Sequence, residues 1–249
     1  MLSKSQISFL KSLQQKKFRK THGLFLVEGI KSVKEFANSA YQVDTIYHTP
    51  AFSSKMLNLS QKINFHEISA TDLEKFSSLT TPQEVIALVK IPQWPAFSTQ
   101  KLANSFSLVL DGVQDPGNLG TIIRTADWFG LNTILCSEDT VDAYNPKVVQ
   151  ATMGSLARIN VHYTNIRNLI KDSKAPVFGA LLNGNSIYNT DFGTEGLIVM
   201  GNEGNGISTD IEALIQQRVT IPQVGKAESL NVAIATAIFC SEVCRKTFK

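Results

Sequence analysis

The hydrophobic residues of this chain recur with two periods, and the alternation between them predicts a series of helices and strands. Ile7, Leu10 and Leu13 recur at three-residue steps behind Ser3, which predicts a helix over residues 3–15. In the first ninety residues such helical stretches alternate with short apolar runs, a pattern typical of an α/β unit. The other predicted elements there are strands at 25–27, 45–48 and 85–89 and helices at 30–40 and 70–77.

The rest of the chain repeats this alternation with more apolar strands. Pro92 and Pro95 stand among small and polar residues, which predicts a stiff linker over residues 91–103. Buried-looking strands that alternate with helices favour a mostly parallel sheet with helices on both faces. The sequence therefore predicts a smaller α/β domain at 1–90 and a larger one at 104–249. In the larger domain, strands are expected at 107–113, 132–136, 177–182, 197–200 and 218–221, and helices at 119–129, 146–151, 166–173, 211–216 and 230–245.

The composition is that of a globular protein, with 43% hydrophobic and 18% charged residues among 249. Three cysteines make no disulfide framework, and the apolar run at residues 7–10 is too short for a secretory signal. The uncharged run at 229–241 falls short of the ~20 residues that a membrane span needs. The four histidines are scattered without metal-ligand spacing. We expect a cytoplasmic protein with no membrane segment and no metal.

Positive charge is concentrated at the start of the chain. Residues 1–103 hold 13 Lys and Arg against 7 Asp and Glu, whereas residues 104–249 hold 11 against 14. No acidic residue precedes Glu28, so the opening segment can neutralise several phosphates, although a solvated helix face is the simpler alternative. The candidate RNA-binding residues in this segment are Lys16, Lys17, Arg19 and Lys20.

The first of three segments with chemical potential covers residues 108–130. Residues 115–118 read Asp-Pro-Gly-Asn, a strong turn sequence, and Asn118 is expected to cap the helix that follows. Arg124 falls opposite the apolar face of this helix, where a guanidinium can hold a phosphate or simply face solvent. Trp128 also lies off the core face, which suggests that another chain or a ligand covers it.

The other two segments follow later strands, at the carboxyl edge where parallel sheets usually bind ligands. Residues 197–208 contain three glycines and Glu203, but their spacing fits neither a dinucleotide fingerprint nor a P-loop. A nucleotide-dependent oxidoreductase is therefore disfavoured, and a loop that approaches a ligand closely remains. In residues 219–232, Ser229 and Asn231 are either helix caps or site residues.

Taken in order, these segments resemble the motifs of the SpoU/TrmH family of RNA ribose 2′-O-methyltransferases, within the SPOUT class. The family pattern N-x-G-x-x-x-R-T-A-x-x-F-G fits residues 118–130, G-x-E-x-x-G-x-S fits 201–208, and I-P-x-x-G-x-x-x-S-L-N-V fits 221–232. The stretch R-x(5)-F-x-V-E-G at 19–29 resembles the RNA-binding domain that often precedes the catalytic one.

The resemblance implies a sheet whose last segment is threaded into a trefoil knot, a rare exception among folds. It also implies that S-adenosyl-L-methionine binds in the knot, mostly to backbone groups. Homodimers would form through the first and last helices of the larger domain. By position, the cofactor contacts would be Leu182, Gly201, Ile221 and Leu230, with Asn183 nearby.

Five residues are implied to be catalytic. Because arginine stays protonated in proteins, we interpret Arg124 as an electrostatic clamp on the RNA rather than as a base. Glu203 would orient Arg124 or its helix, and the remaining three, Asn118, Ser229 and Asn231, would position the ribose and the cofactor. The basic opening segment favours ribosomal over transfer RNA as substrate. A non-catalytic RNA-binding or ribosome-assembly factor on the same scaffold is the alternative.

Overall fold

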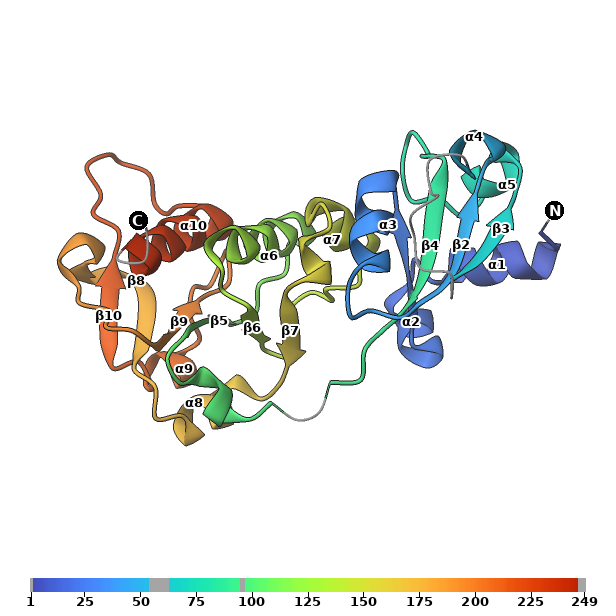
Figure 1. The fold of residues 1–249 in the computed structure, drawn as a ribbon. Helices are drawn as coiled ribbons and strands as arrows, with labels where there is room; N and C mark the ends of the chain where they lie inside the picture. Colours follow the sequence, from blue (N-terminus) through green and yellow to red (C-terminus); the bar gives the residue numbers. More distant parts are fainter. Residues whose placement is uncertain (1, 54–62, 95–96, 246–249) are drawn as a thin grey trace. The chain divides into compact units, whose positions relative to one another are not determined.

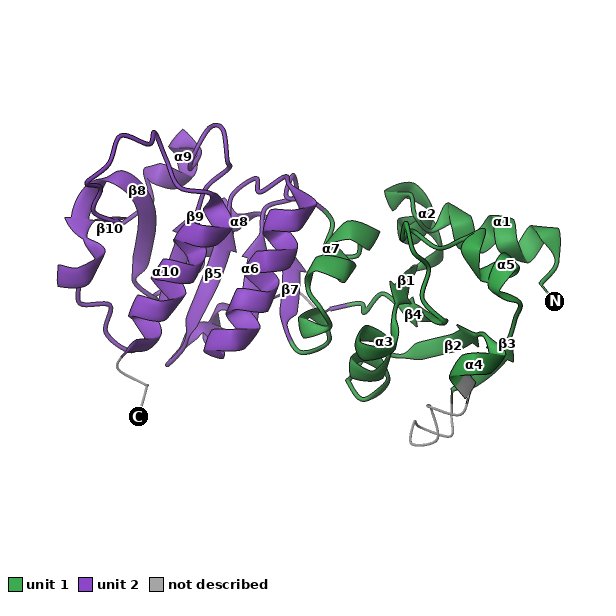
Figure 2. Ribbon diagram, turned by 90° about the horizontal axis from the view of Figure 1, so that it is seen from above, with its two compact units in different colours: residues 1–93, 142–158 green, residues 94–141, 159–249 purple. Residues whose placement is uncertain are grey.

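A computed structural model describes residues 2–53, 63–94 and 97–245 of the chain. Its contacts divide the molecule into two compact units, shown in Figure 2. Unit 1 comprises residues 1–93 and 142–158, and unit 2 comprises residues 94–141 and 159–249. The predicted domain bounds stay a prediction, but the contacts add that residues 142–158 pack within unit 1. Pro95 of the predicted linker lies outside the described residues.

Unit 1 is built on a four-stranded sheet in the order β1-β4-β2-β3. β4 runs antiparallel to both β1 and β2, whereas β2 and β3 are parallel. Alternate residues of β1 bury opposite faces: Leu26 joins an apolar cluster with α1 and α5, and the Phe25 ring contacts Phe36 of α3. The elements are α1 (Lys4–Ser12), α2 (Lys16–His22), β1 (Leu24–Glu28), α3 (Ile30–Ala37), β2 (Val43–His48), α4 (Pro50–Ser53), β3 (Asn64–Glu67), α5 (Ala70–Glu74) and β4 (Val85–Lys90), labelled in Figure 1.

The predicted opening helix is present but shorter than predicted, and a second helix follows it. Ser3 caps α1 by accepting a hydrogen bond from the Gln6 amide, and the helix ends at Ser12 rather than at residue 15. The separate helix α2 was not predicted, because its buried side chain is the charged Arg19 and an apolar period is therefore missing. The strand β3 was also missed, since all four of its residues are exposed.

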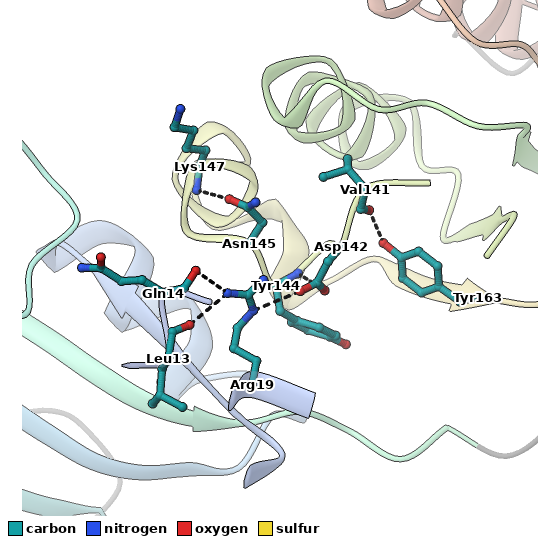
Figure 3. Close-up of polar contacts among 9 residues, drawn as sticks. All are labelled: Leu13, Gln14, Arg19, Val141, Asp142, Tyr144, Asn145, Lys147 and Tyr163. Carbon is teal, nitrogen blue, oxygen red and sulfur yellow. Dashed lines mark hydrogen bonds and ion pairs between the residues drawn. The ribbon is translucent and has the colours of Figure 1, made fainter. Parts of the chain in front are cut away.

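The Arg19 side chain is buried, with only 2% of its surface exposed. Its Nε and Nη2 atoms donate to Asp142 Oδ2 at 3.0 and 2.6 Å (Figure 3). Its Nη1 atom donates to the carbonyl oxygens of Leu13 and Gln14 at 2.9 and 2.8 Å. A guanidinium satisfied on three sides in this way fixes α2 against the end of α1. Arg19 therefore has a structural contact where the sequence suggested an RNA contact.

Residues 142–158 complete unit 1 from the middle of the chain. The Tyr144 ring lies 4.8 Å from the Phe25 ring, centroid to centroid, and Asn145 caps α7 (Pro146–Ala151). Arg158 forms an ion pair with Glu35 of α3. A short 3-10 helix, η2 (Ser155–Ala157), lies between these contacts. Unit 1 is consequently assembled from two stretches of sequence.

Unit 2 contains a six-stranded sheet in the order β10-β8-β9-β5-β6-β7, with every neighbouring pair parallel. Helices α6 and α10 pack together on one face, and α8 and α9 lie on the other (Figure 1). This confirms the predicted fold class; the trefoil threading stays a prediction. The elements are η1 (Thr99–Leu102), β5 (Phe106–Leu110), α6 (Pro116–Phe129), β6 (Thr133–Cys136), β7 (Asn160–Tyr163), α8 (Ile166–Asp172), β8 (Val177–Ser186), η3 (Ile187–Asn189), β9 (Gly196–Met200), α9 (Thr209–Glu212), β10 (Gln217–Thr220) and α10 (Val232–Cys244). Across the described residues, no helix has the length and apolarity needed to cross a bilayer.

We predict that Asp142→Asn lowers the free energy of unfolding by about 3 kcal/mol, because it leaves the buried Arg19 charge without its counter-charge. Denaturant unfolding followed by circular dichroism measures this change. Glu35→Gln is the matched control, since it breaks the half-exposed pair with Arg158 in the same unit. That variant should lose less than about 1 kcal/mol. Equal losses for the two variants would contradict the structural role of Arg19.

Candidate active site

Three side chains meet at the carboxyl edge of the large sheet, one from each of the three motif segments. Asn118 Nδ2 donates to Glu203 Oε1 at 3.0 Å. Asn231 Nδ2 donates to Asn118 Oδ1 at 2.9 Å. Asn118 therefore uses both ends of its amide to join the loop after β9 to the start of α10. The structure brings together three of the five predicted catalytic residues in one hydrogen-bonded row.

The cap of α6 differs from the sequence prediction. Asp115, not Asn118, occupies the N-cap position, and its carboxylate accepts a hydrogen bond from the Asn118 amide at 2.8 Å. Pro116 then starts the helix, as its fixed backbone angle favours. Because Asp115 satisfies the helix start, the Asn118 side chain is available for Glu203 and Asn231.

Glu203 acts on the start of α6 and not on Arg124. Its two carboxylate oxygens also accept from the backbone amides of Gln114 and Asp115, each at 3.4 Å. Of the two roles that the sequence allowed, orienting the helix is the one that these contacts support. The Arg124 side chain is exposed and makes no hydrogen bond or ion pair with any residue that the structure describes.

The start of α10 shows that capping and site roles need not exclude each other. Asn231 Oδ1 accepts from the amides of Ala233 and Ile234 at 2.9 and 3.3 Å, while its Nδ2 reaches Asn118. The helix begins at Val232, two residues later than predicted. Ser229 is exposed and forms no hydrogen bond with the described part of the chain.

The glycine-rich loop after β9 folds tightly back on itself. A Cβ atom on Gly201 would lie 2.2 Å from the carbonyl carbon of Gly206, so only glycine fits there. The neighbouring Asn202 was missed by sequence reasoning, although an Asn after a strand is a common turn former. Its Nδ2 donates to the Gly112 carbonyl at 2.7 Å, and its Oδ1 accepts from the Gly204 amide at 2.8 Å.

A second missed contact anchors the far end of this loop. Asp111 follows β5, and its Oδ2 atom accepts from both the amide and the hydroxyl of Ser208 at 2.7 Å. Ser208 occupies the N-cap of α9 but does not cap it with its side chain. The loop between β9 and α9 is therefore tied to the end of β5 through Asn202 and Asp111.

Two of the predicted cofactor residues, Leu182 within β8 and Leu230 just before α10, expose apolar side chains. Leu182 is 76% exposed and Leu230 is 49% exposed. Leu182 lies in the part of β8 beyond its pairing with β9. The side chain of Asn183 is held by Arg218, whose Nη2 donates to Asn183 Oδ1 at 2.7 Å. Ile221 follows β10 directly and is half-buried.

The cysteines of the chain offer no reactive thiolate. Burial raises the pKa of Cys136, and burial together with the neighbouring Cys244 raises the pKa of Cys240 to about 12. All three thiols are buried, and none forms a disulfide. Within the described residues, no three His, Cys, Asp or Glu side chains gather as a metal site would require.

Comparison with known proteins identifies both parts of the chain. Residues 105–241 match the SpoU rRNA Methylase family, and residues 4–87 match an MRM3-like substrate binding domain. The 23S rRNA (guanosine(2553)-2′-O)-methyltransferase RlmP of Bacillus subtilis is 32% identical, over 92% of this chain and 91% of the relative.

Solved structures share the whole fold. A TrmH-family protein from Porphyromonas gingivalis is 40% identical, with a TM-score of 0.90 and coverage of 99% of both chains. An AdoMet-bound rRNA methyltransferase from Sinorhizobium meliloti is 26% identical, with a TM-score of 0.89 and coverage of 100% of this chain and 97% of that one.

The fold and the site together define an α/β protein whose candidate active site lies at the carboxyl edge of a parallel sheet. Within that class, the chain belongs to the SpoU rRNA methylase family. The dinucleotide oxidoreductase considered from the sequence is thereby excluded.

We predict that Gly201→Ala destabilises the protein by about 2 kcal/mol, because the added methyl group meets backbone atoms that must move. A thermal melt should show a fall of several degrees. Gly204→Ala is the matched control from the same loop, since its Cβ atom would meet only Asn202 Oδ1 at 3.6 Å. If both variants have the same melting temperature as the natural chain, the loop is not close-packed at Gly201.

Proposed function

We propose that this chain transfers a methyl group from S-adenosyl-L-methionine to a ribose 2′-hydroxyl of structured RNA, more specifically ribosomal RNA. The observation that carries the proposal is the hydrogen-bonded row of Asn118, Glu203 and Asn231, which joins all three motif segments. The Bacillus subtilis relative is named for the same reaction on 23S rRNA. The buried cysteines form no disulfide, which suits a reducing compartment, and we propose the cytoplasm as the place of action.

The residues predicted to hold the cofactor suit it chemically. Leu182 and Leu230 have exposed apolar side chains that would contact its body, and Gly201 would contribute backbone groups. Ile221 and Asn183 would complete the contacts, with Asn183 held in place by Arg218. When bound, the cofactor supplies an activated methyl group on a sulfonium.

Arg124 is proposed as the cation that holds the RNA. Methyl transfer needs the ribose hydroxyl oxygen about 3 Å from the methyl carbon, in line with the bond that breaks. A permanently charged, exposed guanidinium can bind the adjacent phosphate and stabilise negative charge on the ribose oxygen. Asn118, Asn231 and Ser229 would position the ribose and the cofactor. Glu203 supports the reaction indirectly by fixing the start of α6.

Self-association is proposed through α6 and α10, which pack side by side. Trp128 on α6 is 84% exposed and Ile234 on α10 is 53% exposed. Large apolar side chains in such positions are stabilised when a second copy covers them. A homodimer through these two helices would bury both.

The RNA-binding assignment of the basic opening segment changes in one residue. Lys16, Lys17 and Lys20 are exposed on α2, whereas Arg19 is buried against Asp142. We propose that the three lysines contact RNA phosphates and that Arg19 holds their helix in place. A non-catalytic RNA-binding factor would not need the Asn118, Glu203 and Asn231 row, and its intact geometry favours the enzyme.

We predict that Arg124→Ala lowers methyl transfer by about 10²- to 10³-fold, because the charge that stabilises the reacting oxygen is lost. The assay is incorporation of labelled methyl groups into ribosomal RNA from cells that lack this protein. Binding of S-adenosyl-L-methionine, measured by calorimetry, should persist. Methyl transfer by Arg124→Lys should lie between that of the natural chain and that of Arg124→Ala, because lysine keeps the charge but loses paired hydrogen bonding. Full turnover by Arg124→Ala would remove this residue from the chemistry.

We predict that replacing Lys16, Lys17 and Lys20 together with Glu weakens RNA binding about tenfold and flattens its salt dependence. Each lost phosphate contact lowers the slope of log affinity against log salt by about 0.7–0.9. Fluorescence anisotropy at several salt concentrations measures both quantities. Lys90→Glu is the control, an exposed lysine at the end of β4. An unchanged slope would make the lysines an ordinary solvated surface.

A further inference from the structure

Unit 1 contains a cavity that the reaction at the large sheet does not use. Its volume is about 470 Å³, and it opens where β2 ends, between the start of α4, helix α5 and the turn that leads into β4. Pro50, Leu73 and Pro82 form apolar walls, and Thr49, Glu74 and Gln83 contribute polar groups. A mixed lining of this kind, mostly apolar with a few polar groups, is typical of small-ligand sites.

One polar atom of this cavity lacks a partner. Thr49 Oγ1 is buried and has no hydrogen-bond partner among the described residues. The backbone of Thr49 is fully engaged, since its amide donates to the Glu84 carbonyl at 2.9 Å and its carbonyl accepts from the Phe52 amide at 3.0 Å. A buried hydroxyl without a partner costs about 1–3 kcal/mol. A ligand that bonds this hydroxyl would recover that cost.

The charges of the lining decide which part of an RNA would enter. Among the described residues of the lining, Glu74 and Glu84 carry charge and none is a lysine or an arginine. Carboxylates repel phosphate but accept hydrogen bonds from the N–H groups of bases. The apolar walls suit the flat face of a base. The cavity therefore favours an unpaired nucleobase over the sugar-phosphate backbone.

We infer that this cavity binds one unpaired base of the substrate RNA, with guanine preferred; the inference rests on the proposed RNA methyltransferase function. Guanine presents two adjacent N–H donors on one edge, which match the two oxygens of a carboxylate such as Glu74. Uracil presents only one such donor. Thr49 Oγ1 would bond a further polar atom of the base.

A cation for the attached phosphate lies near the cavity wall. Gly29 packs against Gln83 so closely that a Cβ atom on Gly29 would lie 2.4 Å from Gln83 Oε1. Helix α3 begins directly after Gly29 and carries the exposed Lys31 in its first turn. The proposed site assigns Lys31 to the phosphate of the nucleotide whose base enters the cavity.

The test uses the full chain and labelled RNA hairpins that differ only in one bulged position, which carries guanosine, inosine, uridine or no base. We expect anisotropy to show at least fivefold tighter binding of the guanosine bulge than of the abasic one. Inosine, which lacks the amino group, should lie between them. Glu74→Gln should lose the preference for guanosine over uridine. Glu67→Gln, an exposed position on β3 with the same charge change, should keep it.

The Thr49 variants separate binding from folding. Thr49→Val removes an unpartnered hydroxyl, so its melting temperature should hold or rise while the base preference falls. Thr49→Ser keeps the hydroxyl and should keep the preference. Equal binding of all four hairpins by the natural chain, or an unchanged preference in both Thr49→Val and Glu74→Gln, would overturn the base site alone. Failure to bind any of the hairpins would instead count against the proposed function.

Discussion

The candidate active site of this protein is organised around a single carboxylate. Glu203 lies in the loop after β9, yet it accepts hydrogen bonds from the side chain of Asn118 and from the amides at the start of α6. Asn118 passes the connection on to Asn231, 113 residues further along the chain. The loop after β9 and the starts of α6 and α10 are thus joined by one set of hydrogen bonds, and the sites proposed for cofactor and ribose lie beside it.

A buried ion pair has the corresponding role in the smaller unit. The sequence grouped Arg19 with three lysines as RNA contacts. Its guanidinium instead donates hydrogen bonds to Asp142 and to two carbonyl groups. The buried Arg19 side chain holds α2 in place, and the same helix exposes Lys16, Lys17 and Lys20. A charged residue within a basic cluster can therefore organise the surface without belonging to it.

The sequence predicted five of the six strands of the parallel sheet and most of its helices, because their apolar runs and periods are strong; it missed β7, where only Val161 is buried. It also singled out polar residues at the ends of strands, and three of them, Asn118, Glu203 and Asn231, are hydrogen-bonded to one another. Their catalytic roles stay a prediction. It could not predict α2, whose buried residue is charged, or β3, whose residues are all exposed. The role of Asp142 could not be predicted for a different reason: its partner Arg19 lies 123 residues away, and no local pattern indicates such a pairing. The same holds for Asn202 and Asp111, whose roles are to fasten loops.

The discontinuous make-up of unit 1 has a consequence for how such proteins can be divided or recombined. A gene segment that ends after residue 93 would encode the sheet of this unit but not residues 142–158, which pack on it. The resulting fragment would keep Arg19 and lose Asp142, Tyr144 and the rest of that surface. Exchange of substrate modules between related enzymes, in the laboratory or in evolution, must therefore carry a compatible internal segment along with the amino-terminal one.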